Sequence, residues 1–232
     1  MFNRLKRTER LVWKKKEDEF VEKEIHLCKL GVMNCGSIPG HIIPNYPRVL
    51  KEGFISIKKE SEEFLKTKAN TQEKKDLARA ILTCCDAVHD FANRYAAEAR
   101  KLARVEKEPQ RREELNRIAD ACERVPWNPP QSFYEALQSL WLTHMLFMLA
   151  ESYPGPGLSH GRIDQYLYPY YKRDIDSGRL TRADAKEQLE CWMIKHNYAY
   201  DFARIGVKGI SAGFGQLMTL GGQGPKGEDV TN

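Results

Sequence analysis

The side chains best placed for chemistry lie in loops or at the starts of helices. His41 belongs to a proline-bounded loop, residues 37–47, where an imidazole can point into a cavity and donate or accept a hydrogen bond. A histidine that merely braces this loop is an equal alternative. Arg162 and Asp164 enter a helical segment beside several tyrosines. They could form a catalytic pair, but this placement is more typical of a structural clamp that bonds nearby carbonyl groups.

Metal and redox chemistry find little support in the sequence. The six histidines, His26, His41, His89, His144, His160 and His196, are scattered one per predicted element, and His144 and His196 lie on apolar helix faces, as core histidines do. The six cysteines contain no CxxC spacing. We therefore predict no metal site and a reduced, cytoplasmic protein.

Glycines near the C-terminus raise two weak alternatives. The segment from Gly222 to Gly227 has the spacing of a phosphate loop, but Glu228 stands where such a loop needs lysine. The letters of a serine hydrolase motif occur at 209–213 around Ser211, within a glycine-rich coil that lacks the strand and helix the motif requires. Nucleotide binding and serine hydrolysis are thus both disfavoured.

Charge and hydropathy indicate a globular helical protein. The net charge of +5 arises from 37 basic and 32 acidic residues that are mixed along helical stretches, which predicts solvated helix faces and no nucleic-acid partner. The most apolar segment, 133–150, contains Glu135, Gln138 and His144, which favours a buried helix over a membrane span.

Hydrophobic periodicity and capping residues predict a succession of helices. We expect them from about Pro47, over 71–104, over 111–123, over 133–150, over 162–175 and after Thr181. In the second of these, the apolar stripe comprises Leu77, Ile81, Cys84, Cys85, Val88, Phe91, Tyr95 and Leu102. Residues 217–220 are predicted to form a short buried strand with nothing in the chain to pair with, which indicates a fragment of a longer protein.

Five motifs in order resemble the glycyl radical enzymes, the pyruvate formate-lyase family with its dehydratase and decarboxylase relatives. They are GHIIP at 40–44, Glu151-Ser152, GRIDQYLYPYY at 161–171, WMIK at 192–195, and the turn from Thr219 to Asn232. The resemblance extends over nearly the whole chain, so residues 1–232 are similar to the N-terminal part of one pyruvate formate-lyase-like domain.

The resemblance implies an α/β fold that is mostly helical in this portion. It would supply the helical shell and first strands of a ten-stranded barrel. It also implies radical lyase chemistry on a small organic substrate in a dry interior. A protein-derived glycyl radical would be the cofactor, with no metal or nucleotide in this chain. The implied partners are a radical S-adenosylmethionine activating enzyme and, in many family members, a second copy of the enzyme.

The resemblance also assigns residues. His41 and Phe214 are expected to line the substrate pocket, together with Tyr153, Gly155 and Gly157 from the loop after Glu151. That loop lacks the His-Ser pair of diol dehydratases, which slightly favours decarboxylation of an arylacetate over diol dehydration. Neither a Cys-x-Glu loop nor a glycyl radical loop is present, so no catalytic residue is expected here and the chain alone should be inactive. A non-catalytic partner subunit, or remnant, is the alternative.

Overall fold

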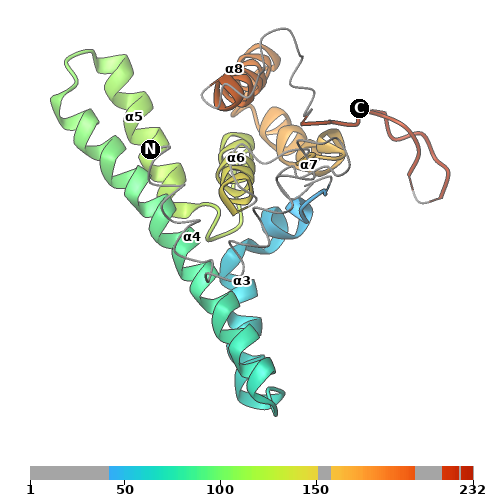
Figure 1. Cartoon of the computed structure of the whole chain (residues 1–232). Helices are drawn as coiled ribbons and strands as arrows, with labels where there is room; N and C mark the ends of the chain where they lie inside the picture. Colours follow the sequence, from blue (N-terminus) through green and yellow to red (C-terminus); the bar gives the residue numbers. More distant parts are fainter. Residues whose placement is uncertain (1–41, 151–157, 202–215, 225, 232) are drawn as a thin grey trace, which may run out of the picture. The chain divides into compact units, whose positions relative to one another are not determined.

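The long elements of the protein are α-helices. The computed structural model describes residues 42–150, 158–201, 216–224 and 226–231. Its helices are α3 (Tyr46–Thr67), α4 (Gln72–Val105), α5 (Pro109–Arg124), α6 (Phe133–Ala150), α7 (Ile163–Asp176) and α8 (Arg182–Asp201), shown in Figure 1. Each helix predicted from residue 47 onward is confirmed, with ends shifted by a few residues at most.

Side-chain caps explain where two of these helices begin. The Ser132 hydroxyl accepts a hydrogen bond from the Glu135 amide at 3.1 Å, at the start of α6. At the start of α8, the Thr181 hydroxyl accepts from the Asp184 amide at 3.1 Å, and the Asp184 carboxylate accepts from the Thr181 amide at 3.2 Å. The bonds at α8 are reciprocal, whereas at α6 the Glu135 carboxylate accepts from the Gln131 amide at 2.6 Å. Both sets satisfy amides that have no partner within the helix, so both predicted helix starts are confirmed.

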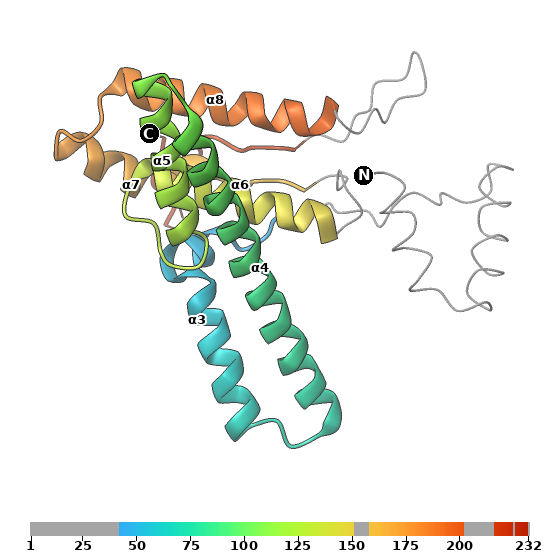
Figure 2. The ribbon, with the colours of Figure 1, turned by 90° about the vertical axis from the view of Figure 1, so that its left-hand side faces the viewer.

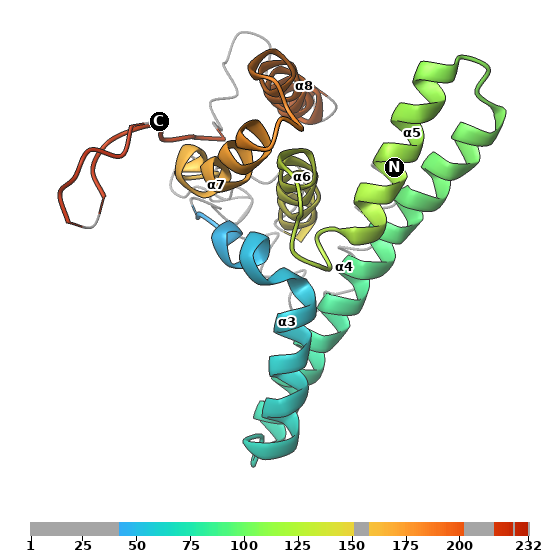
Figure 3. The same cartoon turned by 180° about the vertical axis from the view of Figure 1, so that it is seen from behind.

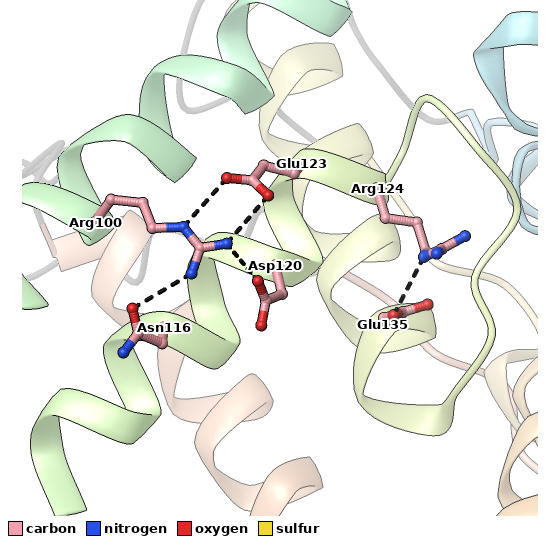
Figure 4. Close-up of polar contacts among 6 residues, drawn as sticks. All are labelled: Arg100, Asn116, Asp120, Glu123, Arg124 and Glu135. Carbon is pink, nitrogen blue, oxygen red and sulfur yellow. Dashed lines mark hydrogen bonds and ion pairs between the residues drawn. The ribbon is translucent and has the colours of Figure 1, made fainter. Parts of the chain in front are cut away.

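Helices α4 and α5 lie side by side as an antiparallel hairpin (Figures 1 and 3). Small residues allow the two to approach, since Ala92 and Ala96 of α4 pack in one cluster with Cys122 of α5. Figure 4 shows Arg100 of α4 reaching across to α5, where its guanidinium donates to Glu123 at 3.1 and 3.2 Å and to Asn116 at 3.3 Å. The hairpin thus combines close packing with a charged bridge at its edge.

The predicted packing stripe of α4 is partly wrong. Cys85 and Val88 are buried as expected, but Leu77, Tyr95 and Leu102 are 60, 49 and 46 % exposed. The buried face is instead made largely of alanines, namely Ala78, Ala92, Ala96, Ala99 and Ala103. Close contact with α3 and α5 selects small side chains for the inner face, so the larger apolar residues lie beside it.

Helix α6 is central to the packing, because it contacts α3, α4, α5, α7 and α8. Its residues Phe133, Leu140 and Trp141 belong to the main hydrophobic core, which also contains Leu167 of α7 and Trp192 of α8. A helix that is apolar on all sides needs such surroundings, which confirms the prediction of a core helix. Within the described ranges, no helix is long and apolar enough to cross a membrane.

Helix α3 runs beside α4 (Figure 2) and is broken at Gly53. Gly53 has φ +69° and ψ 166°, which opens the helix to the connector between α5 and α6. The Phe54 amide donates to the Pro126 carbonyl at 3.1 Å, and the Ile55 amide to the Trp127 carbonyl at 3.0 Å. The break therefore exchanges bonds within the helix for bonds to a distant segment.

Strand structure is limited, among the described residues, to three isolated β-bridges. These pair Ile42 with Leu158, Gly161 with Met218, and Gln223 with Asp229. The buried strand expected at 217–220 is wrong, because Met218 forms only one bridge while Leu217 and Leu220 are 69 and 70 % exposed. The mostly helical character is confirmed, whereas the ten-stranded barrel stays a prediction.

Candidate active site

Three segments that are far apart in the sequence lie together, namely 42–43, 158–161 and 216–219. Each of them directly precedes or follows a segment that is predicted to line the pocket. Ile42, which follows His41, forms a parallel bridge with Leu158, and the Ser159 amide donates to the Ile42 carbonyl at 3.1 Å. The His160 amide donates to the Leu217 carbonyl at 3.0 Å, so the segment after residue 215 joins the same place. The residues that border the three predicted pocket segments are therefore joined by backbone hydrogen bonds.

Gly161 makes this junction sterically possible. Its φ of +68° lies in the left-handed region, which glycine adopts without strain. A Cβ at this position would lie 3.0 Å from Cγ2 of Ile43. The Gly161 carbonyl also accepts from the Thr219 amide at 2.9 Å, beside the bridge to Met218. A glycine here lets the 42–43, 158–161 and 216–219 segments approach one another.

The predicted pocket residues themselves lie outside the described residues. This applies to His41, Tyr153, Gly155, Gly157 and Phe214, and also to the disfavoured serine motif around Ser211. Their assignment to a substrate pocket stays a prediction.

Arg162 lies at the start of α7 and points to the C-terminal segment. Its guanidinium donates to the Gly221 carbonyl and to the Gln223 carbonyl, both at 2.8 Å. The neighbouring Gln165 side chain donates to the Val230 carbonyl at 2.7 Å. Fixed planar donors of this kind hold backbone carbonyls in a defined orientation. The start of α7 thus binds residues 221–230 at several points.

Asp164 completes this contact from the acceptor side. Its carboxylate accepts from the Gly221 amide at 2.7 Å and from the Gln165 side chain at 2.9 Å. Burial opposes ionisation of Asp164, but the bonds from Gln165 and Gly221 and the charge of Arg162 outweigh it and hold the pKa below its ordinary value. The carboxylate therefore stays charged and continues to hold the Gly221 amide.

A cluster of three buried histidines lies directly beside the junction. His144 comes from α6, His160 from the segment before α7 and His196 from α8, and their exposed fractions are 0, 0 and 5 %. One ring nitrogen from each lies within 4.8 Å of the others. The sequence analysis treated the histidines as scattered, and for these three this is wrong, because the fold brings their three separate elements together.

The environment keeps this cluster uncharged. Burial lowers the pKa of His144 to about 3, with His196 adding to the effect, and burial lowers the pKa of His196 to about 4. Burial, followed by the neighbouring His144 and His196, also shifts the pKa of His160 well below its usual range. Neutral imidazoles have a free lone pair, so the cluster can accept hydrogen bonds or bind a cation.

The cysteines in the described ranges do not match a loop that carries a sulfur radical. Cys84 and Cys85 lie in α4, Cys122 in α5 and Cys191 in α8. Burial raises the pKa of Cys122 to about 11, which keeps it a thiol. These cysteines are helix residues, and none is followed two positions later by glutamate.

Comparison with known proteins identifies the family. The pyruvate formate lyase-like family model matches residues 12–232. An isethionate sulfite-lyase from Desulfovibrio desulfuricans is 38% identical over 198 residues, which are 82% of this chain and 24% of that protein. A trans-4-hydroxy-L-proline dehydratase from Clostridioides difficile is 32% identical over 203 residues, 84% of this chain and 25% of the relative.

Solved structures agree with this result. A crystal structure of a glycyl radical enzyme from Archaeoglobus fulgidus matches with a TM-score of 0.72 and 32% identity, covering 84% of this chain and 26% of that one. The chain spans about a quarter of the length of the relatives it matches.

The expected preference for arylacetate decarboxylation finds no support in these similarities. An indoleacetate decarboxylase is 33% identical over 190 residues, against 38% for the sulfite-lyase. Three observations instead indicate the same family: the shared sequence motifs, the helical fold, and the matches over most of this chain. The chain belongs to the pyruvate formate lyase-like family of glycyl radical enzymes.

Proposed function

We propose that this chain forms the helical shell and one wall of the substrate pocket of a glycyl radical lyase. The observation that carries the proposal is the junction at Ile42, Leu158 and Met218. It brings together the flanks of the segments that hold His41, Tyr153 and Phe214. Because these segments are joined, residues next to them can contact one bound molecule, even though they are far apart in the sequence.

The proposed reaction is elimination of a leaving group from a small organic substrate, at a carbon–sulfur or carbon–oxygen bond. The sulfite-lyase relatives, at 38 and 37% identity, support this class, and two dehydratases also match at 32 and 30%. A sulfur-centred radical outside the described residues would remove hydrogen from the substrate. The part of this chain would be to bind and orient the molecule through His41, Phe214, Tyr153, Gly155 and Gly157, and to exclude water around it.

The partners proposed for the whole protein follow the family. They are a small-molecule substrate, a radical S-adenosylmethionine activating enzyme and a second copy of the polypeptide. The glycyl radical cofactor would reside outside the described residues. Arg162 and Asp164 are proposed to be structural, because both hold the backbone near Gly221.

Anaerobic activation of the whole polypeptide that the gene encodes tests this function. We would incubate it with an activating enzyme, S-adenosylmethionine and a reductant, then record the electron paramagnetic resonance spectrum. Isethionate, 1,2-propanediol, trans-4-hydroxy-L-proline and indoleacetate would each be assayed for turnover. We expect a glycyl radical doublet and turnover of a substrate that loses a sulfur or oxygen group. Turnover of indoleacetate and of no other compound would reject the proposal that a carbon–sulfur or carbon–oxygen bond is broken.

The variant His41→Ala separates a pocket role from a role in folding. It should keep the radical signal and lower kcat/KM by about 100-fold or more, because one oriented polar contact is lost at the reacting substrate. His89→Ala is the matched control, since His89 stacks on Trp127 with ring centroids 4.3 Å apart. Full turnover by His41→Ala would contradict the assignment of His41.

A non-catalytic partner subunit of the same fold is the second candidate. The exposed apolar side chains of Tyr95, Leu102 and Val105, which lie near one another toward the end of α4, favour it, because they are available to another chain. This candidate predicts that the polypeptide purifies with a second protein and develops no radical signal of its own under the activation conditions. A doublet on the polypeptide itself would dismiss it.

A further inference from the structure

The three clustered histidines present more nitrogen atoms than their surroundings satisfy. Within the described residues, both ring nitrogens of His160 and Nε2 of His196 have no hydrogen-bond partner. These two side chains are 0 and 5 % exposed. A buried polar atom without a partner is unfavourable, so a set of them in one place points to a bound species that would satisfy them.

A contact within α8 determines which ring nitrogen of His196 is free. Its Nδ1 lies 2.8 Å from the Trp192 carbonyl oxygen, which can only accept a hydrogen bond. Nδ1 therefore carries the proton, and Nε2 has its lone pair available within the cluster. This arrangement, in which one ring nitrogen donates to a carbonyl and the other is free, is the usual one for a histidine that binds a metal ion.

His144 has a similar outer contact. Its Nδ1 lies 2.6 Å from the Tyr46 hydroxyl, and burial raises the pKa of that phenol well above its usual range. The phenol thus stays uncharged, and its oxygen can accept a hydrogen bond from Nδ1–H of His144 when Nε2 binds an ion. Tyr46 also stacks on His160, with ring centroids 5.5 Å apart. One tyrosine therefore orients two of the three rings.

The distances are close to those of a metal site. The ligand atoms lie within 4.8 Å of one another. Tetrahedral Zn²⁺ with bonds of about 2.0–2.1 Å needs its nitrogen ligands roughly 3.3 Å apart. Side-chain rotations would have to bring the three nitrogens to that spacing when an ion binds. Imidazole nitrogens suit Zn²⁺ and similar ions, whereas Mg²⁺ and Ca²⁺ prefer oxygen ligands.

We propose that His144, His160 and His196 bind a divalent transition-metal ion of the Zn²⁺ class, with a fourth position left for water. The ion would link α6, α8 and the 158–161 segment, which carries the backbone junction to Ile42 and Leu217. Its role would be to brace this junction. The proposal does not depend on the substrate or on the radical reaction.

Zn²⁺ competition with a chromogenic chelator provides the first test, on the tag-free full chain after removal of metal with EDTA. We expect one ion per chain with a dissociation constant below about 1 μM, and a rise in Tm on adding Zn²⁺ but not Mg²⁺. Failure to bind Zn²⁺ below about 10 μM would overturn the proposal.

Variants locate the site. His160→Gln and His196→Gln should each weaken binding by about 100-fold, because each removes one of three nitrogen ligands. His89→Gln, outside the cluster, should bind as the unaltered chain does. Circular dichroism without metal would confirm that each variant is folded. Unchanged Zn²⁺ affinity in a folded His160→Gln variant would overturn the proposal.

Co²⁺ substitution in the unaltered chain needs no variant. A tetrahedral nitrogen and oxygen site gives visible d–d absorption without an intense thiolate-to-metal band in the near ultraviolet. A strong thiolate band would assign the ion to the cysteines and contradict the proposal.

Discussion

At the scale of single residues, Asp174 shows how one buried carboxylate joins two helices. It lies in α7 and is 4 % exposed. Its Oδ2 accepts from the Phe133 amide at the start of α6 at 2.7 Å, and its Oδ1 accepts from Arg179 at 2.6 Å. A negative charge at the N-terminus of a helix is favourable, and a paired buried charge avoids the cost of burial alone.

The histidine cluster makes the stability of the metal-free protein depend on pH. The folded-state pKa values of about 3 for His144 and about 4 for His196 lie below the ordinary 6.5. As pH falls below 6.5, the unfolded chain therefore takes up protons that the folded chain does not. The free energy of unfolding should decrease by about 2 kcal/mol per histidine at pH 5.

Urea unfolding in EDTA at pH 7.5, 6 and 5 would measure this dependence. His196→Gln should flatten it, whereas His89→Gln should leave it unchanged. Equal stability at pH 7.5 and pH 5 would show that these histidines are not neutral in the fold.

At the scale of elements, Gly53 is the position where α3 depends most on a single residue. An added Cβ would contact the Trp127 carbonyl and lie 2.9 Å from the Asn128 carbonyl carbon. The backbone conformation is also one that other residues rarely adopt. Gly53→Ala should therefore lower the free energy of unfolding by about 3 kcal/mol, as measured by chemical denaturation.

Gly178→Ala is the matched control for this substitution. Gly178 has φ +71°, but an added Cβ would have no neighbour within 4 Å. Only the backbone cost of about 1 kcal/mol should appear. Equal losses in the two variants would show that the contact with the connector has no effect.

Helix positions could be predicted from the sequence, because caps and periodicity are local. Ser132, Thr181 and the run after Thr71 each specify a helix start within a few residues. The inner face of α4 could not be predicted in the same way, because Ala92 and Ala96 carry no strong hydrophobic signal. Which face is buried depends on how closely a neighbouring helix approaches.

The candidate site was predicted only in part for the same reason. Motifs indicated the family, and Arg162 and Asp164 were identified as residues that contact backbone. The histidine cluster was missed because His144, His160 and His196 have no ligand spacing along the chain. Two histidines on apolar helix faces, with a third just before a helix, were the available signal.

At the scale of the whole molecule, the start of α7 holds the C-terminal segment. Arg162 donates to the Gly221 and Gln223 carbonyls, and Gln165 donates to the Val230 carbonyl. Arg162→Gln should accelerate amide hydrogen exchange across 221–230 by about 10-fold or more, because two charge-assisted hydrogen bonds are lost. Exchange in α4 and α5 should not change.

Lys172→Gln on the same helix is the control, since Lys172 forms an exposed ion pair with Asp176. Mass spectrometry of exchanged peptides would separate the two regions. Unchanged exchange at 221–230 in Arg162→Gln would mean that this segment is held by other contacts.

The α4–α5 hairpin also has a consequence for the order of events during synthesis. Its two helices are neighbours in the chain, so their contacts close a short loop, whereas the Ile42–Leu158 bridge must enclose more than half of the described sequence. Short loops close faster, so a nascent polypeptide should acquire the hairpin first. The junction at Ile42, Leu158 and Met218 would then assemble later, and pulse-labelled refolding should find its amides protected after those of the hairpin.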